Sequence, residues 1–203
     1  MNIAVIGAGH VGGALATQFA KVGHSVKLGV RDPQESKVQE LVSKGITAHT
    51  VQEAVVDASD IIVLAIPAKA GYEVAQTLGN LSSKVVIDAT NAVFGKPQKY
   101  ATVADAILDI CKAKDIVKCF NTTGFANMAD PDFKGTKIDM FMAGNSKKAK
   151  EIASKLAKEI GFGEVYDLGG NENFGLIEQL ALVWVTLVQQ GNGRDIAFKI
   201  LKR

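Results

Sequence analysis

The chain has 203 residues, of which 47% are hydrophobic and 22% charged, and its formal net charge is +2. This composition is ordinary for a globular protein and allows one domain with a substantial core. The nearly balanced charge gives no sign of nucleic-acid binding, and no run of aromatic residues is interleaved with basic ones. We expect a single domain over residues 1–203, with residues 170–203 as a C-terminal helical extension.

The cysteines and histidines are too scattered to indicate a metal site. Cys111 and Cys119 lie eight residues apart with no C-x-x-C motif, and the three histidines are far from one another in the sequence. We expect both cysteines to be reduced, buried thiols of a cytoplasmic protein. The apolar start is six residues long and merges into a glycine-rich turn, so no signal peptide is expected.

The first thirteen residues, MNIAVIGAGHVGG, predict a buried strand that runs into a glycine-rich turn and then a helix. Its glycines have G-x-G-x-x-G spacing, in which the first allows the sharp turn, the second lets a pyrophosphate approach the backbone and the third lets helix and strand pack closely. The helix N-terminus adds unpaired N–H groups and a partial positive charge. A turn that binds nothing is the alternative. The predicted cofactor-binding residues of this turn are Gly7, Ala8, Gly9, His10, Val11 and Gly12.

The end of the predicted second strand favours NADP over NAD. In NAD-binding units an acidic residue about 20 positions after the glycines binds the ribose 2′-OH, whereas an arginine accommodates a 2′-phosphate. Val30 and Arg31 stand in this window, and Asp32, directly before Pro33, is expected to cap the next helix instead. Arg31 can form charge-assisted hydrogen bonds with a phosphate, and Lys37 can add a second charge. A solvated loop arginine is the alternative interpretation of Arg31.

Further along, strand-like and helix-like segments alternate, which is typical of a doubly wound sheet. The predicted strands after the first cover residues 26–28, 46–49, 60–67, 84–88, 115–120, 138–143 and 164–167. The predicted helices cover residues 11–22, 35–42, 51–58, 68–78, 100–112, 147–160 and 176–188. Residues 89–99 and 121–137 are expected to be irregular. The fold class is therefore predicted as α/β, with a doubly wound, mostly parallel Rossmann sheet and a small C-terminal extension.

Ligands on such sheets bind beyond the carboxyl ends of the strands, where the strand order reverses. After the predicted strand over 60–67, the segment Ala65-Ile66-Pro67 offers a rigid, apolar edge to a nicotinamide ring. Asn91 and Asn121 follow two later strands, and their amides can hold a carboxamide or a substrate carbonyl. Each asparagine alone is equally well explained as a turn residue after a strand. Because the strand ends converge on one edge, the pocket as a whole is the stronger prediction.

Taken together, the segments IAVIGAGHVGGALA, LAIP, DATN and FNTTGFANM, with an arginine ending the second strand, resemble the NADPH-dependent coenzyme F420 (deazaflavin) reductase family. The resemblance covers essentially the whole chain, and the family shares its fold with the reductase domain of STEAP-type metalloreductases. It implies hydride transfer between NADP(H) and a flavin or deazaflavin (coenzyme F420) that acts as acceptor or donor. The residues that match the family's cofactor motif and pocket positions are Gly7, Gly9, Gly12, Arg31, Ile66, Asn91 and Asn121.

Hydride transfer between two stacked rings depends on proximity and orientation more than on a general acid, and the cofactor supplies the reactive bond. Accordingly, no catalytic side chain and no metal ligand are predicted. The expected partner is a small-molecule substrate or flavin-type cofactor, not a nucleic acid. An NADP(H)-binding redox sensor without turnover is the alternative function. An imine reductase is a weaker alternative, because a longer helical dimerisation region would be expected.

The predicted helix over residues 176–188 is apolar on nearly every side. It is too short to span a bilayer of about 30 Å, so no membrane insertion is expected. A helix that is apolar all round is buried in its own domain or under a partner. We expect it to pack on its own sheet and to contribute to a homodimer contact, with purely intramolecular burial as the alternative.

Overall fold

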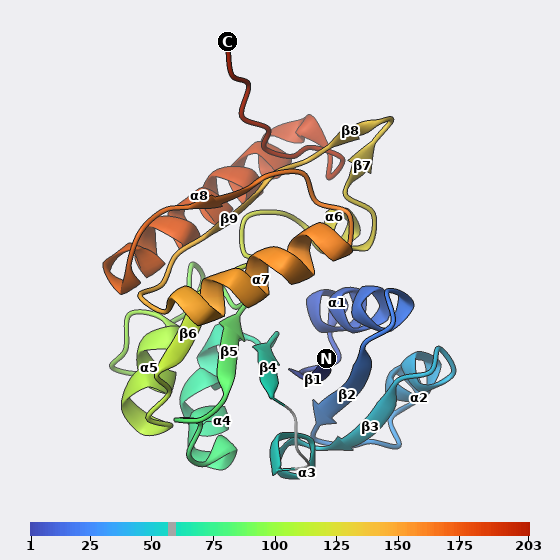
Figure 1. Cartoon of the computed structure of the whole chain (residues 1–203), viewed down its shortest axis with the longest axis vertical. Helices are drawn as coiled ribbons and strands as arrows, with labels where there is room; N and C mark the ends of the chain where they lie inside the picture. Colours follow the sequence, from blue (N-terminus) through green and yellow to red (C-terminus); the bar gives the residue numbers. More distant parts are fainter. Residues whose placement is uncertain (57–59) are drawn as a thin grey trace.

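The computed structural model of the chain describes residues 1–56 and 60–203, and its centre is a six-stranded parallel sheet (Figure 1). The strand order is β3-β2-β1-β4-β5-β6, so the chain reverses its direction of winding between β1 and β4. The predicted doubly wound, mostly parallel sheet is confirmed. The strands are β1 (Asn2–Ile6), β2 (Ser25–Val30), β3 (Thr47–Thr50), β4 (Ile61–Leu64), β5 (Val85–Asp88) and β6 (Asp115–Lys118).

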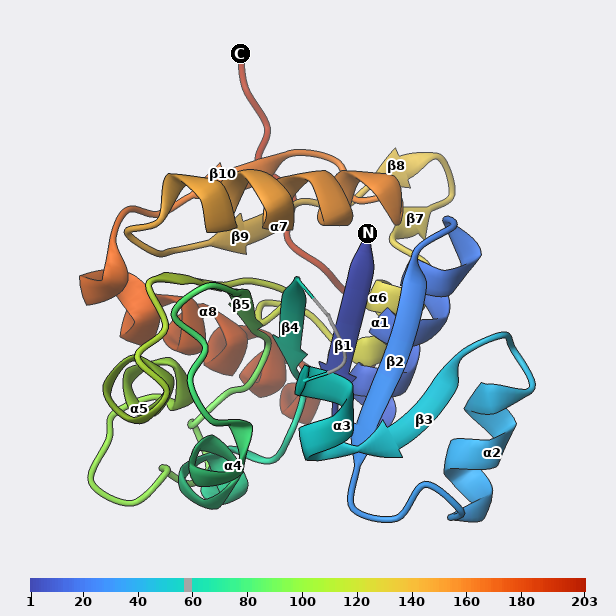
Figure 2. The ribbon, with the colours of Figure 1, turned by 60° about the horizontal axis from the view of Figure 1, so that its bottom comes forward.

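Helices cover both faces of the sheet. One face carries α1 (His10–Lys21) and α7 (Lys147–Glu159), and the other carries α3 (Val51–Val56), α4 (Gly71–Leu78) and α5 (Val103–Ile110) (Figure 1). Alternate residues of β1 point to opposite faces, so Ile3 and Val5 join one core cluster whereas Ala4 and Ile6 join the other. Because both faces are buried, the strands are continuous apolar runs. Helix α2 (Ser36–Val42) packs beside β3 at the edge of the sheet (Figure 2).

Local side-chain chemistry sets where some helices begin. Helix α5 starts at Val103, because Thr102 and Asp105 form a reciprocal capping box. The Asp105 carboxylate accepts from Thr102 N at 2.9 Å, and Thr102 Oγ1 accepts from Asp105 N at 3.2 Å.

After β4, a 3₁₀ turn at Ala68–Ala70 precedes α4. Residues 57 and 58 of the helix predicted over 51–58 lie outside the described residues.

The expectation of an irregular stretch over 121–137 is wrong. This stretch contains the short helix α6 (Phe125–Ala129), which packs on α1, and a hairpin of β7 (Asp132–Phe133) and β8 (Thr136–Lys137). The two last predicted strands form as β9 (Met140–Met142) and β10 (Val165–Asp167), but they pair with each other in a separate two-stranded sheet. An antiparallel bridge between Lys118 and Ala143 links this small sheet to β6.

The C-terminal part begins with a 3₁₀ turn (Asn171–Asn173) and continues as α8 (Phe174–Leu187) and a π-helical turn (Val188–Asn192). Although the sequence of α8 is apolar on nearly every side, only one face is buried, and Leu176, Val183 and Leu187 are exposed. Beyond this turn the chain returns to the start of β9, where Phe198 O accepts from Asp139 N and Ile200 N donates to Asp139 Oδ2, and only the final residues project outward (Figure 2). In the described parts of the chain, no helix has the length and apolar character needed to cross a membrane.

Candidate cofactor site

The glycine-rich turn lies at the reversal point of the sheet, where α/β proteins bind ligands. Gly7 follows β1, and its N–H donates to Gly29 O on β2 at 2.9 Å. On the other side, Ala65 N donates to Ile6 O at 2.9 Å. The turn is therefore tied to both neighbouring strands, and the segment after β4 lies beside it.

The three glycines of the motif differ in the space around them. Gly7 has a φ of +107°, which side chains rarely adopt, and a Cβ there would collide with Ala65 O. A Cβ on Gly12 would collide with Gly7 O, so this glycine allows α1 to approach the turn. A Cβ on Gly9 would meet nothing within 4 Å, and no side chain caps the start of α1 there. The open space over Gly9 and the uncapped helix start fit a phosphate group.

The remaining residues of the turn connect it to the core and to α6. Ala8 and Val11 are half-buried and pack on the core cluster under α1. His10 is exposed, and its ring stacks on Phe125 with centroids 4.5 Å apart and an interplanar angle of 17°. The first turn of α1 thus contacts the segment that follows β6.

The residues after β2 present positive charge to solvent. Arg31 is exposed and has no carboxylate partner among residues 1–56 and 60–203. Lys37 is also exposed, but its Nζ lies 2.9 Å from Glu35 Oε1. The expectation that Asp32 caps the next helix is wrong, because α2 begins at Ser36 and Asp32 Oδ1 instead accepts from Gln34 N at 2.9 Å. This local turn ends at Gln34, two residues before the first residue of the helix.

The segment after β4 contacts the glycine turn directly. A Cβ on Gly7 would lie 3.2 Å from Ile66 Cγ2, so the Ile66 side chain rests against the turn. Ala65 and Ile66 are half-buried, and Pro67 is exposed and precedes the 3₁₀ turn before α4. An apolar edge therefore lies next to the site where the glycines can hold phosphate.

Asn91 and Asn121 lie close together, as predicted. Asn91 Nδ2 donates to Asn121 O at 3.1 Å, and Asn121 Nδ2 donates to Thr90 O at 2.7 Å. The bond to a carbonyl fixes which end of the Asn121 amide is nitrogen. Its oxygen, Oδ1, is then buried and accepts no hydrogen bond from the described residues. Because an unsatisfied buried acceptor is costly, this oxygen fits a ligand that donates an N–H group, such as a carboxamide.

Three buried ionisable side chains lie next to the asparagines and were not predicted as site residues. They are linked to Asn121 through Thr90 O, which accepts from both Lys118 Nζ and Asn121 Nδ2. Lys118 and Asp88 are fully buried, and the side chain of Glu178, from α8, is 8% exposed. Lys118 Nζ lies 2.8 Å from Asp88 Oδ2 and 2.8 Å from Glu178 Oε1. Burial alone lowers the pKa of Lys118, but the two carboxylates raise it above its ordinary value. Burial raises the pKa of Glu178, against the opposing effect of Lys118.

These residues did leave a signal in the sequence. Lys118 interrupts the apolar strand IVKCF, and Glu178 interrupts the apolar helix. A charged residue inside a buried run predicts a buried ion pair, because an unpaired charge there is very costly. The sequence does not show that Lys118 pairs with Glu178, because the two residues lie 60 positions apart.

A small apolar pocket of about 290 Å³ lies beside the segment that follows β6. A Cβ on Gly124 would lie 2.6 Å from the Trp184 ring, so helix α8 packs closely on this segment. Trp184 Nε1 and Asn127 Nδ2 donate to Ile196 O at 2.7 Å and 2.8 Å, which ties the C-terminal residues to the same place. The residues that line the pocket are Gly124, Phe125, Ala126, Trp184, Val185, Val188, Gln189 and Arg194.

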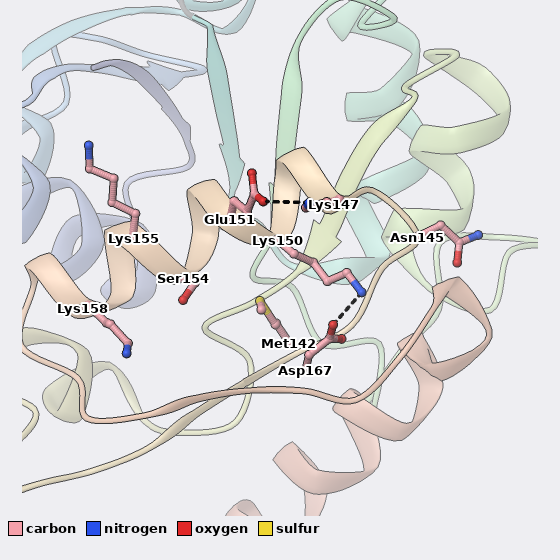
Figure 3. Close-up of a pocket in the computed structure, with 9 residues that line it drawn as sticks. All are labelled: Met142, Asn145, Lys147, Lys150, Glu151, Ser154, Lys155, Lys158 and Asp167. Atoms are coloured by element: carbon pink, nitrogen blue, oxygen red, sulfur yellow. Dashed lines mark hydrogen bonds and ion pairs between the residues drawn. The ribbon is translucent and has the colours of Figure 1, made fainter.

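A larger groove of about 580 Å³ runs along α7 and contains none of the predicted site residues (Figure 3). Its lysines are paired with carboxylates: Lys150 Nζ lies 2.7 Å from Asp167 Oδ2, and Lys147 Nζ lies 3.8 Å from Glu151 Oε1. The groove lies over one face of the helix, not at the carboxyl edge of the sheet. We therefore place the candidate cofactor site at the strand ends and not in this groove.

Comparison with known proteins gives consistent matches. Residues 2–92 match the family model described as NADP oxidoreductase, coenzyme F420-dependent. The chain is 26% identical over 221 residues to the F420-dependent NADP reductase of Methanothermobacter thermautotrophicus, with 98% of this chain and 94% of that protein covered. It is 23% identical over 183 residues to the metalloreductase STEAP3 of Rattus norvegicus, with 89% of this chain and 36% of that protein covered. A candidate F420-dependent NADP-reductase structure from Arthrobacter sp. FB24 matches with a TM-score of 0.86, 26% identity and full coverage of both chains.

Proposed function

Because the chain belongs to the F420-dependent NADP oxidoreductase family, we propose that it transfers a hydride between NADP(H) and a flavin or deazaflavin of the coenzyme F420 type. The observation that carries the proposal is the placement of the glycine turn, Ile66 and the Asn91–Asn121 pair along one edge of the sheet. Arg31 follows β2 and Asn121 follows β6, four strand spacings or about 19 Å apart. This edge suits an extended dinucleotide with a phosphorylated ribose at one end and a carboxamide at the other.

In this proposal each group of residues binds one part of the cofactor. The glycine turn and the start of α1 hold the pyrophosphate, and Arg31 with Lys37 binds the 2′-phosphate. The nicotinamide ring lies on the apolar edge after β4, and Asn121 Oδ1 accepts from its carboxamide. The complete set is Gly7, Ala8, Gly9, His10, Val11, Gly12, Arg31, Lys37, Ala65, Ile66, Pro67, Asn91 and Asn121.

The apolar pocket beside Trp184 supports an aromatic acceptor. Its lining combines two aromatic side chains, Phe125 and Trp184, with the charge of Arg194 at the rim. The volume of about 290 Å³ lies at the lower end of small-molecule pockets, and we propose that the ring of the acceptor enters it while its edge faces the nicotinamide. NADPH supplies the hydride when it is bound, and the residues of this chain bind and orient the two rings. Such positioning accounts for roughly 7–11 kcal/mol of a barrier in favourable cases.

The proposal is tested by mixing the protein with NADPH and one candidate acceptor at a time, and by following the absorbance of the reduced nicotinamide. We expect oxidation with coenzyme F420 or a flavin and little with NADH as donor. NADPH binding without oxidation by flavins, deazaflavin or quinones would instead support the redox sensor.

We further propose that the single domain over residues 1–203, with its extension over 170–203, forms a homodimer in the cytoplasm through α8. Leu176, Val183 and Leu187 are exposed at spacings of seven and four residues, so they share one face of the helix. A solvent-exposed apolar stripe of this kind suits a second copy of the chain. Light scattering at micromolar concentration that gives the mass of one chain would contradict the dimer.

A further inference from the structure

The segment that carries Asn91 is fixed from its N-terminal side by the buried lysine network. Thr90 N and Oγ1 donate to Asp88 Oδ1 at 2.9 Å and 2.6 Å. Thr90 O accepts from Lys118 Nζ at 2.9 Å and from Asn121 Nδ2 at 2.7 Å. The same carbonyl thus connects the lysine with the asparagine whose Oδ1 accepts no hydrogen bond from the described residues.

On the other side of Asn91, the backbone is held by Glu178 of α8. Ala92 N donates to Glu178 Oε2 at 3.1 Å, across 86 positions of the sequence. The second oxygen of the same carboxylate, Oε1, lies 2.8 Å from Lys118 Nζ. The ammonium group donates hydrogen bonds to Asp88 Oδ2 and Thr90 O, and Glu178 Oε1 contacts it as an ion-pair partner. One carboxylate therefore connects both anchors of the segment.

We infer that Glu178 is a positioning residue for hydride transfer: by holding Lys118 and Ala92 N together, it fixes the Asn91 and Asn121 amides against the nicotinamide end of the cofactor. The inference rests on the proposed function, because it takes the asparagines as the carboxamide-binding groups. It assigns a role to a helix that contributes no residue to the predicted dinucleotide site. Glu178 acts through its neighbours and does not contact the reacting atoms.

The role requires a carboxylate and not merely a polar side chain of the same size. Glutamate offers two charged oxygens, one as the ion-pair partner of Lys118 and one that accepts from Ala92 N. Glutamine has one acceptor oxygen and a donating amide, so it can keep only one of these two contacts. Glu178→Gln therefore releases one anchor while it preserves shape. Glu172 provides a matched control, since it lines the same cavity of about 530 Å³ and accepts from Gly170 N at 3.0 Å in its own turn.

The experiment compares the affinities of two ligands, NADPH and 2′-phospho-ADP-ribose, which lacks the nicotinamide. In Glu178→Gln we expect NADPH to bind about fivefold to tenfold more weakly, as for one weakened hydrogen bond, and the fragment to bind within twofold of wild type. Glu172→Gln should change neither affinity. Equal losses for both ligands, or no loss, would overturn the inference. A wild-type protein that binds neither ligand would overturn the proposed function, and the inference with it.

A double variant tests whether Glu178 acts through the asparagine. If it does, Glu178→Gln changes NADPH affinity by no more than twofold in an Asn121→Ala background, and additive losses contradict this. Thermal unfolding and near-UV circular dichroism identify variants that do not fold. If Glu178→Gln does not fold, Glu178→Asp is measured, because it keeps the charge and shortens the reach. Selective loss of NADPH affinity in that variant supports the inference, and an equal or absent loss overturns it.

Discussion

Replacing Arg31 by alanine should remove the preference for NADPH over NADH. Arg31 is exposed and has no carboxylate partner among the described residues, so its guanidinium can turn fully toward a phosphate. A charge-assisted hydrogen bond is worth about 1.5–3 kcal/mol, and solvent exposure favours the lower half of this range. At about 1.4 kcal/mol per factor of ten, we expect the Kd for NADPH to rise about 10-fold to 40-fold. The Kd for NADH, which has no 2′-phosphate, should change less than twofold.

Lys37→Ala is the matched control for this prediction. Lys37 carries the same charge on the adjacent helix, but its Nζ already lies 2.9 Å from Glu35. We therefore expect a smaller effect, about threefold on the Kd for NADPH. The assay is titration of each variant with NADPH and NADH at two salt concentrations, and the preference of the wild type should fall at higher salt. Equal weakening of both cofactors by Arg31→Ala, or no change in either, would refute the assignment of Arg31 to the 2′-phosphate.

Three further predictions concern packing and ionisation. Gly12→Ala should abolish NADPH binding and lower the melting temperature, because its Cβ would collide with Gly7 O. Burial alone raises the pKa of Asp139, but hydrogen bonds from Lys199, Ile200 N and Glu164 N lower it below 3.8, so its stabilisation is present above that pH and lost as the pH falls further. Urea unfolding of Asp139→Asn should accordingly show a weaker loss of stability on acidification than the wild type. Burial raises the pKa of Cys111 to about 11 and of Cys119 to about 12, so neither thiol should react with a thiol reagent at pH 8 until the protein is denatured.

Much of the fold could be predicted because it depends on local patterns. Buried parallel strands are apolar runs, and the turn after β1 requires glycines whose positions the sequence shows directly. The helix α6 and the β7–β8 hairpin were missed because they are too short for a hydrophobic period to appear, and the helix is stabilised by its packing on α1. The role expected for Asp32 failed because its side chain bonds to a backbone N–H two residues later.

The candidate site could be predicted where each strand contributes its own motif, but not where distant segments meet. The bond between Asn91 and the backbone of Asn121 follows from neighbouring strand ends, so the sequence predicts that these residues lie close together. The contact of Glu178 with Lys118 depends on how α8 packs across the end of the sheet, which no local pattern contains. The apolar pocket beside Trp184 was missed for the same reason, because its lining comes from α6, α8 and the C-terminal residues.

The fate of the hydride tests the proposed function most directly. NADPH labelled with deuterium at the reactive position of the nicotinamide is mixed with the protein and oxidised coenzyme F420, and the reduced deazaflavin is analysed by mass spectrometry. We expect one deuterium in the reduced ring for each NADPH oxidised from the labelled face, because direct transfer between stacked rings does not exchange with water. Deazaflavin reduction without deuterium from either labelled face, or NADPH binding without any reduction, would contradict it.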